Sequence, residues 1–286
     1  MTDFRVLDRA FFADLDHAKR QPITAVPTGF PQWDTYCRDE GGGIGLARGW
    51  QILIGGKPGI GKSLLATNLT RTALQQGVSV GRIDLEMSNA QSATRLMATV
   101  SGIGIRRLEH GAEYEPKDAA SAADFFKRAY EATGATIVVT DDISSLEEIE
   151  AAVDDLAARG VRYVVVDYLQ LVHCDEEGAV AKVANIARRT RLAAKRNGLV
   201  VLGVSQITNE AAKRDTAPTQ HDLFGGGSLG QSADQVVLLN HCAYERTTRD
   251  QAVGELLLDK NRHGAQGTIP ITYDYRTLTI RERHDD

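Results

Sequence analysis

Apolar residues along the chain fall into short continuous runs and longer segments with helical spacing, and the two kinds alternate. The continuous runs predict buried strands. These strands are expected at residues 50–54, 79–84, 136–140, 163–167, 199–204 and 236–239. Apolar residues three and four apart predict helices at residues 64–76, 90–100, 118–133, 145–159 and 183–196. This alternation predicts an α/β fold with a doubly wound, mainly parallel sheet.

The N-terminal segment departs from this alternation. Residues 8–19 predict an amphipathic helix whose apolar face, which includes Phe11, must be buried against another surface. That surface is either the helix's own domain or a neighbouring subunit, and the pattern does not distinguish between them. Because Pro22 follows the helix, we expect an N-terminal extension at residues 1–26 and one domain at residues 27–286.

The C-terminal half of the chain contains one irregular segment and one set of alternating segments. Residues 208–228 show neither the helical nor the strand period and include three consecutive glycines, so they predict a loop that is either functional or disordered. Residues 254–259, 268–273 and 278–281 alternate as strands do and predict a closing antiparallel meander. The predicted fold is therefore a mainly parallel sheet that continues into antiparallel strands.

Composition and charge limit the class of protein. Of the 286 residues, 42% are hydrophobic and 25% are charged, which is typical of a soluble globular protein. No apolar run approaches the ~20 residues that a membrane span needs, and the N-terminus has no signal-peptide pattern. Three scattered cysteines (Cys37, Cys174 and Cys242) form no metal-ligand spacing and no even set for disulfides, which agrees with a reducing, cytoplasmic location. With a net charge of −5, contact with DNA requires a local basic patch within an assembly.

A glycine-rich segment between the first strand and helix has the sequence of a phosphate-binding loop. It matches the pattern G-x-x-x-x-G-K-[ST] in the strand–loop–helix context that the pattern requires. Glycines let successive backbone N–H groups point inward, and the positive end of the following helix favours a polyphosphate. We expect Lys62 to contact the β- and γ-phosphates of ATP and Ser63 to bind Mg²⁺. The predicted nucleotide-binding residues are Gly56, Lys57, Pro58, Gly59, Ile60, Gly61, Lys62, Ser63 and Leu64.

Polar residues at the ends of the other predicted strands supply further candidates. In a doubly wound sheet, ligands bind at the carboxyl ends of the strands. Asp167 ends the run V-V-V-D, where a carboxylate can hold Mg²⁺ through a water. Glu86 follows the strand expected next to the phosphate-loop strand, and we expect it to polarise the attacking water. Gln206 can sense the γ-phosphate through hydrogen bonds. Asp141 and Asp142 end a further strand at the same edge.

Two cations lie near the C-terminus, in the sequence K-N-R-H-G at residues 260–264. We expect this segment in the turn of the last hairpin. Cations at a hairpin tip are usually only solvated, but the transition state of phosphoryl transfer is often stabilised by an arginine from a neighbour. Because the phosphate loop contains no arginine, we expect one to reach it from a second subunit.

Together these motifs resemble the RecA-type C-terminal motor domain of the DnaB-like replicative DNA helicases. The motifs follow the family's order, and the resemblance extends from Pro27 to Arg281. They are the phosphate loop, D-L-E-M at 84–87, D-D at 141–142, V-V-V-D-Y-L-Q-L at 164–171, V-S-Q at 204–206, D-L-x-x-x-G-S-L-x-Q-x-A-D at 222–234 and K-N-R-H-G at 260–264. The resemblance implies a RecA-like ATPase that works as a homohexameric ring, moves along single-stranded DNA and unwinds duplex during replication.

The resemblance also implies roles for the candidate residues. Glu86 corresponds to the catalytic glutamate, and Arg262, with Lys260 as its companion, corresponds to a finger that reaches the next subunit's nucleotide. The implied catalytic residues are Lys62, Glu86, Gln206, Lys260 and Arg262, and the implied metal ligands are Ser63 and Asp167. Residues 8–19 correspond to a linker helix that docks on the adjacent subunit. A primase or a loader protein is a further expected partner, and no membrane is expected.

The chain departs from the family pattern in the two segments expected to face the central channel, at residues 173–182 and 207–227. Residues 175–177 are all acidic where a cationic or polar segment is expected. Because phosphate contacts dominate affinity for DNA, this acidity weakens the prediction of DNA binding. The candidate DNA-binding residues are Lys182, Lys213 and Arg214.

Two alternatives to a helicase stay open at this point. One is a RecA-like recombination or annealing ATPase that forms filaments on DNA without unwinding it. The other is a non-motor RecA-fold ATPase in a regulatory assembly. The acidic segment keeps the second alternative open, as does the expected absence of the family's N-terminal domain.

Overall fold

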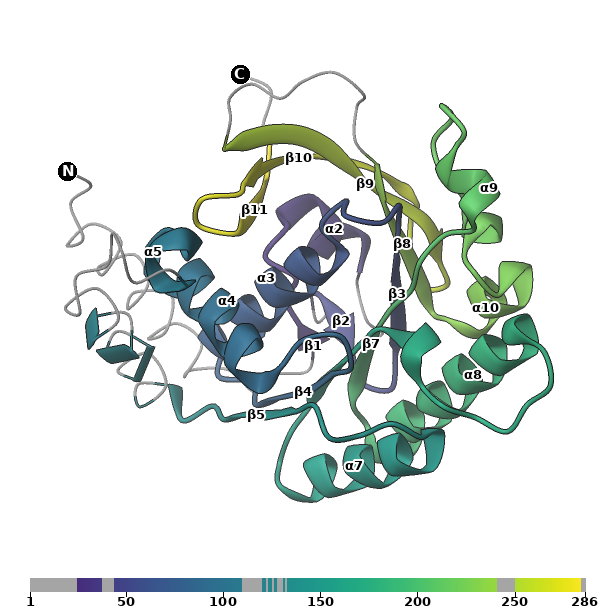
Figure 1. Ribbon diagram of the computed structural model, residues 1–286, viewed down its shortest axis with the longest axis horizontal. Coiled ribbons are helices and arrows are strands. Elements are labelled where there is room, and N and C mark those ends of the chain that lie inside the picture. The colour runs from purple at the N-terminus through teal and green to yellow at the C-terminus, as the bar shows by residue number, and fades with distance from the viewer. Residues whose placement is uncertain are drawn as a thin grey trace.

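A nine-stranded sheet organises the protein in the computed structural model, with the order β11-β10-β9-β8-β3-β7-β6-β4-β5 (Figure 1). The structure describes residues 25–37, 44–109, 133–240 and 250–283, together with residues 120, 121, 123, 124, 126, 127 and 131. The parallel strands are β3 (Gln51–Gly55), β4 (Val80–Asp84), β5 (Ile137–Thr140), β6 (Tyr163–Asp167), β7 (Val200–Val204) and β8 (Gln235–Asn240).

The remaining strands extend the sheet beyond β8. They are β9 (Gln251–Asn261), β10 (Gly267–Asp274) and β11 (Thr279–Glu282), and each pairs antiparallel with its neighbour. A separate two-stranded sheet joins β1 (Ala25–Val26) to β2 (Leu46–Ala47). The predicted class, a mainly parallel α/β sheet with antiparallel strands at its C-terminal end, is confirmed.

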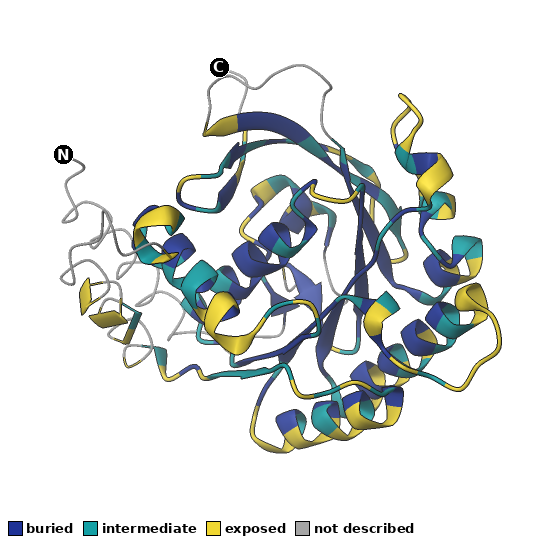
Figure 2. Ribbon diagram, in the orientation of Figure 1, coloured by how far each residue is buried: buried dark blue, intermediate teal, exposed yellow. Residues whose placement is uncertain are grey.

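Helices cover both faces of the sheet because successive residues of a strand point to opposite sides. In β3, Ile52 and Ile54 join one hydrophobic core, whereas Leu53 joins the other. The first core includes residues of α2 (Pro31–Tyr36), α3 (Lys62–Gln75) and α4 (Asn89–Ser101), and α5 (Ile105–Glu109) follows α4. The second core includes residues of α7 (Leu146–Ala158), α8 (Ala179–Asn197), α9 (Asn209–Ala212) and α10 (Gly226–Ser232). In Figure 2 the parallel strands between these layers are almost continuously buried, except for the edge strand β5, which is of intermediate burial.

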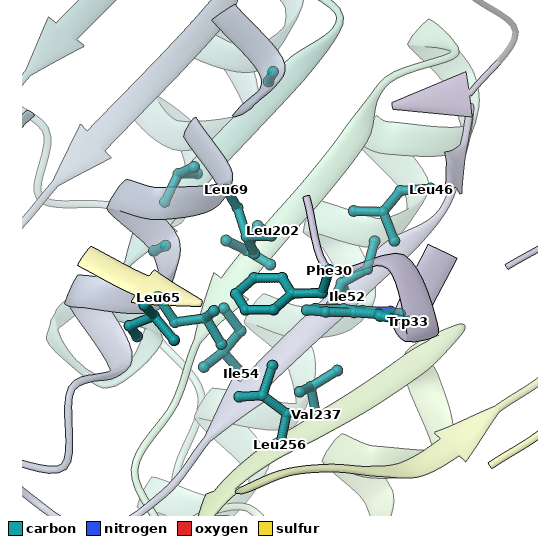
Figure 3. Close-up of a cluster of buried hydrophobic side chains, with 14 of the residues drawn as sticks. Phe30, Trp33, Leu46, Ile52, Ile54, Leu65, Leu69, Leu202, Val237 and Leu256 are labelled. Atoms are coloured by element: carbon teal, nitrogen blue, oxygen red, sulfur yellow. The ribbon is translucent and has the colours of Figure 1, made fainter. Parts of the chain in front are cut away.

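Phe30 and Trp33 are two of the aromatic side chains in the first core. Their ring centroids lie 6.1 Å apart, and Figure 3 shows both rings among the aliphatic side chains of the sheet and of α3. Trp33 is fully buried, and its Nε1 donates a hydrogen bond of 3.1 Å to Oε1 of Gln235. Because a buried indole N–H needs an acceptor, this bond fixes α2 against the start of β8.

The order of the strands corrects one prediction. Residues 80–84 form β4, as expected, but β7 and β6 lie between β4 and the phosphate-loop strand β3. Glu86 therefore does not follow a strand adjacent to β3. Apolar patterns identify strands but carry no information about their neighbours, and here two later strands are inserted between two earlier ones.

The C-terminal half corrects two further predictions. Residues 208–228 are not an irregular loop, because they contain α9, the 3₁₀ helix η2 (Gln220–Asp222) and the first residues of α10. These elements are too short and too glycine-rich to produce a helical period. The K-N-R-H-G segment also lies in the β9–β10 hairpin rather than the last one, since β9 extends to Asn261.

The other boundaries agree with the sequence to within a few residues. Helix α8 begins at Ala179, four residues earlier than predicted, so Lys182 belongs to a helix and not to a loop. A second 3₁₀ helix, η1 (Leu169–Leu171), follows β6. The described residues between 120 and 133 are helical, in line with the prediction for 118–133. The predicted helix at residues 8–19 and most of the extension at 1–26 lie outside the described residues.

Candidate functional site

The phosphate-loop sequence lies at the carboxyl end of β3 and leads directly into α3. Gly61 is the N-cap residue of α3, and its φ of +106° is one that glycine adopts without strain. A Cβ at this position would also come within 3.2 Å of the Tyr273 ring. No side chain caps the first turn of α3, so its backbone N–H groups are available to an anion. Local geometry therefore matches a loop that binds phosphate.

Lys62 directs its ammonium group into this loop. Its Nζ donates hydrogen bonds to the carbonyl oxygens of Gly56 (3.1 Å) and Lys57 (2.9 Å). Burial lowers the pKa of Lys62, while the negative charges of Asp167 and Glu86 act in the opposite direction. The lysine, the aspartate and the glutamate predicted to form the site are therefore close enough to interact electrostatically.

Asp167 ends β6 and is only 2% exposed. Neither oxygen of its carboxylate has a hydrogen-bond partner among the described residues. Burial raises the pKa of Asp167 to about 6, although the Arg82 guanidinium and the nearby Ser63 hydroxyl act against this rise. A buried carboxylate without a partner is costly, so it suggests a ligand or a cation.

These groups fit Mg²⁺ bound together with a nucleotide. Mg²⁺ keeps several waters and is usually held by one or two protein oxygens together with phosphate oxygens. Ser63 and Asp167 supply such a small set of oxygen donors. The described residues contain no cluster of three or more His, Cys, Asp or Glu side chains that could hold a metal without a nucleotide.

Glu86 and Gln206 approach the loop from different strands. Glu86 is exposed beyond the end of β4, at the same edge of the sheet as the loop. Gln206 follows β7, which lies between β3 and β6. The backbone N–H of Ile207 donates to the Gly56 carbonyl at 3.4 Å, and that of Phe224 donates to the Gln206 carbonyl at 2.8 Å. The main chain around Gln206 thus joins the phosphate loop to the segment before α10.

Two other acidic residues predicted at this edge have a different environment. Asp141 accepts hydrogen bonds of 2.8 Å from the backbone N–H and from Nδ2 of Asn89. Asp141 therefore fixes the start of α4. It follows β5, the edge strand next to β4, and is thus separated from the phosphate loop by the width of several strands. Asp142 is exposed.

The sequence did not single out Arg82. Its guanidinium forms a buried ion pair of 2.9 Å with Asp84, and its Nη1 donates to the Thr70 hydroxyl at 3.1 Å. The sequence does contain a signal that could have identified this pair: Arg82 and Asp84 carry opposite charges two residues apart in an apolar strand, and residues i and i+2 of a strand share one face. Arg82 contributes a fixed positive charge behind the carboxylate of Asp167.

Lys260 and Arg262 lie at the other end of the sheet. Gln235 at the start of β8 pairs with Asn261, so the β9–β10 turn (residues 262–266) lies at the amino ends of the parallel strands. Nζ of Lys260 donates to the carbonyl oxygens of Gly230 (2.8 Å) and Gln231 (2.9 Å). A guanidinium nitrogen of Arg262 also donates to the Gln231 carbonyl. Both cations therefore contact the C-terminal part of α10.

This placement separates the two halves of the predicted site. The five residues of β3 lie between the phosphate loop and the amino end of the strand, a span of about 17 Å. The structure does not bring Arg262 and Lys260 together with Lys62, Glu86 and Asp167 in one subunit.

The candidate DNA-binding residues lie in α8 and directly after α9. Lys182 is half-buried in the first turn of α8, and Lys213 is exposed at the end of α9. Arg214 forms an ion pair with Asp222, and its carbonyl accepts a hydrogen bond of 3.0 Å from Nζ of Lys57. The acidic residues 175–177 are exposed immediately before α8.

Comparison with known proteins gives a consistent result. Residues 25–282 match the profile of the DnaB-like helicase C terminal domain. The chain is 29% identical over 258 residues to the replicative DNA helicase DnaB of Leifsonia xyli subsp. xyli, covering 88% of the chain and 54% of that protein. It is 26% identical to the replicative DNA helicase DnaB of Geobacillus stearothermophilus, covering 94% of this chain and 60% of that protein. The chain thus spans between about half and three-fifths of the length of these relatives.

Solved structures show the same fold. A DnaB-like replicative helicase, solved in a study of its interactions with primase, superposes with a TM-score of 0.77 at 22% identity, covering 93% of this chain and 63% of that one. A solved ATPase domain superposes with a TM-score of 0.75 at 21% identity, covering 97% of this chain and 99% of that one.

Within the described residues, every helix is too short or too polar to cross a membrane.

Proposed function

This chain belongs to the family of DnaB-like helicase C-terminal domains, and from that membership we propose that it is an ATP-driven DNA motor. It hydrolyses ATP at the contacts between identical subunits of a hexameric ring, moves along single-stranded DNA and unwinds duplex DNA during replication. The relatives that carry the name replicative DNA helicase support this reading over a recombination ATPase or a non-motor ATPase.

In this proposal the carboxyl edge of the sheet binds and activates the nucleotide. The backbone of the phosphate loop and Lys62 hold the phosphates, and Ser63 and Asp167 hold Mg²⁺. The metal, when bound, neutralises charge on the phosphate oxygens. Glu86 accepts a hydrogen bond from the attacking water, and Gln206 responds to the γ-phosphate.

The observation that carries the proposal is the position of the β9–β10 turn. Lys260 and Arg262 lie at the amino edge of the sheet, about 17 Å from the phosphate loop of their own subunit. An arginine side chain cannot cover that distance. In this proposal a subunit whose loop lacks an arginine receives one from its neighbour, so that hydrolysis needs an assembly.

DNA binding is the second part of the proposal. Lys182, Lys213 and Arg214 contact phosphates from the inner side of the ring, where each contact is repeated by every subunit. The exposed acidic residues 175–177 restrict this contact to α9 and to the first turn of α8. Because the solved DnaB-like replicative helicase interacts with primase, a primase or loader is the proposed protein partner.

Three measurements on the full chain test this function. Electron microscopy with ATP and Mg²⁺ should show closed rings, ATP hydrolysis should increase with single-stranded DNA, and a forked duplex should be separated. Open filaments that bind DNA without separating the fork would favour the recombination ATPase. Hydrolysis that is neither stimulated by DNA nor coupled to unwinding would contradict the motor and favour a non-motor ATPase.

A further inference from the structure

We propose that Trp50 and His263 are positioning residues for Arg262, because their stacked rings hold the β9–β10 turn where the guanidinium, which donates to the Gln231 carbonyl in the isolated subunit, can turn to a neighbouring subunit. This inference rests on the proposed role of Arg262 and extends it, since it names the groups that place the arginine. None of the sequence motifs assigns a role to either ring.

The geometry of the two rings is that of a stacked pair. Their centroids are 4.3 Å apart and the angle between their planes is 11°. Trp50 is 8% exposed and belongs to the first hydrophobic core, directly before β3. His263 directly follows Arg262, and its side chain is 40% exposed. A buried ring just before β3 therefore supports a partly exposed ring next to the arginine.

Asp234 supports the same histidine from a second direction. Oδ1 of Asp234 lies 3.7 Å from Nε2 of His263. Arg191 donates to Asp234 through Nη2 (2.7 Å) and Nε (3.2 Å), and the backbone N–H of Gln51 donates to Oδ2 at 2.9 Å. Burial alone would raise the pKa of Asp234, but these bonds outweigh it and the pKa is lowered. The Asp234 carboxylate is therefore a fixed negative group close to the Nε2 atom of the His263 imidazole.

The backbone of the turn is fixed on both sides of Arg262. The Arg262 N–H donates to the carbonyl oxygen of Asp234 at 2.9 Å. Nδ2 of Asn261 donates to the carbonyls of Tyr36 and Ala265, both at 2.9 Å, and Oδ1 of Asn261 accepts from the backbone N–H of His263 at 3.2 Å.

Gly264 completes this support through its small size. A Cβ at Gly264 would lie 2.0 Å from the Tyr36 carbonyl oxygen, so only glycine allows the turn to approach α2 this closely. With the backbone held, the freedom that remains in the turn belongs to its side chains. The ring stack restricts the His263 side chain, which is next to Arg262.

Position matters at such a site because a displacement of about 1 Å can lower the rate of a reaction about 100-fold. Offset-stacked rings have a preferred geometry, so the stack selects one arrangement of the side chains in the turn. Loss of the stack leaves the backbone bonds in place but allows these side chains to sample other arrangements, and the arginine is then correctly placed in only a fraction of them.

The test uses ATP hydrolysis by the purified full chain, with kcat and KM for ATP measured for each variant. His263→Ala removes the exposed ring and should lower kcat about 10-fold with KM changed less than about 2-fold. His263→Phe keeps a ring over Trp50 and should retain at least about half of the wild-type kcat. Gln266→Ala, an exposed change in the same turn, is the matched control and should behave as wild type.

The second ring and the arginine are tested in parallel. Trp50→Phe should preserve kcat, whereas Trp50→Leu, which keeps an apolar side chain but no ring, should resemble His263→Ala. Thermal unfolding of each variant separates this effect from a loss of stability. Arg262→Ala is measured in the same series, so that the finger and its support are judged separately.

Each outcome either supports the inference or overturns it. A normal kcat in His263→Ala, together with a large loss in Arg262→Ala, overturns the inference and leaves the proposed function standing. Failure of His263→Phe to recover activity also overturns it, since a ring would then not be the feature that matters. A rise in KM with unchanged kcat in His263→Ala would indicate a structural role of the ring and would also overturn the inference. If Arg262→Ala keeps full turnover, the proposed finger fails and the inference fails with it.

Discussion

Asp167 and Asp234 are buried to nearly the same extent, at 2% and 3% exposure, but they lie at opposite ends of the parallel strands and in opposite environments. At the carboxyl end, neither oxygen of Asp167 has a partner among the described residues, and burial raises the pKa of its carboxyl to about 6. At the amino end, Asp234 accepts bonds from Arg191 and from the backbone of Gln51, which keep its pKa low against the effect of burial.

The difference distinguishes a buried carboxylate whose partners lie within the fold from one whose partner would be a ligand. An unpartnered buried carboxylate lowers stability, and at Asp167 the Arg82 charge and the Ser63 hydroxyl offset this effect only in part, since the pKa stays raised. A buried carboxylate with an arginine and a backbone donor is part of the structure, and removal of either partner is costly. We infer that the carboxyl edge is completed by nucleotide and Mg²⁺, whereas the amino edge is already complete and serves as a rigid base for the β9–β10 turn.

The largest expected effect belongs to Lys62 at the carboxyl edge. Lys62→Ala removes the cation that faces the phosphates and should abolish binding of ATP, measured with a fluorescent analogue or by calorimetry. Lys57→Ala is the matched change in the same loop, because it keeps the backbone N–H through which the loop binds phosphate and removes only a side chain whose Nζ donates to the Arg214 carbonyl. It should retain most of the affinity. Tight binding by Lys62→Ala would contradict the assignment of the loop.

The next effect concerns Arg262 at the amino edge. Arg262→Ala should lower kcat by roughly 10³-fold with nucleotide binding nearly intact, because the charge of the transition state loses its counter-ion. Mixed into wild-type protein, the variant should inhibit more strongly than its proportion, which a titration of the two proteins measures. A simple average of the two activities would show that no arginine is supplied between subunits.

Stability measurements compare the two aspartates directly. Arg191→Met leaves the buried carboxylate of Asp234 without its main partner, and the free energy of unfolding should fall by about 2–3 kcal/mol. Asp167→Asn removes an unpartnered buried charge, so the free energy of unfolding should stay the same or rise by up to about 1 kcal/mol. Urea denaturation gives both values. Equal losses in the two variants would remove the distinction between the edges.

The smallest effect is a pH dependence at Lys260. Burial, assisted by the charge of Arg262, lowers the pKa of Lys260 to about 8, so this side chain loses its charge above about pH 8. We expect kcat to decline about 3-fold between about pH 7 and pH 9, and Lys260→Arg, which stays charged, to remove that decline. The unfolded chain holds the proton more tightly, so the contribution of this group to stability rises between about pH 8 and 10.5. Reduced activity above pH 8 with undiminished stability would therefore not result from unfolding.

Local chemistry accounts for the elements that the structure confirms. The glycine-rich turn between β3 and α3 and the polar residues that end β6 and follow β7 were predicted at these places because a glycine-rich turn and a polar residue after an apolar run are local patterns. The position of Arg262 relative to the phosphate loop was not predictable in this way. It depends on which strands are neighbours, and the order β3-β7-β6-β4 results from crossovers that no residue pattern encodes.

The contacts around the β9–β10 turn show the same limit. Trp50 and His263 are 213 positions apart, and nothing near either residue in the sequence marks the other as its partner. Asp234 was part of a quoted motif, yet its bond to Arg191 of α8 joins two elements that are 43 residues apart. Burial decides which polar groups need partners, and burial is a property of the folded chain.

The position of the two edges on one sheet also has a consequence for counting active sites. A contact that joins the amino edge of one subunit to the carboxyl edge of the next uses two different patches, so it is heterologous and can repeat without limit. An open array of n subunits then contains n − 1 complete sites, while a closed ring contains n. Turnover per subunit thus rises with the length of the array and reaches its full value when the last gap closes, so hydrolysis itself reports ring closure.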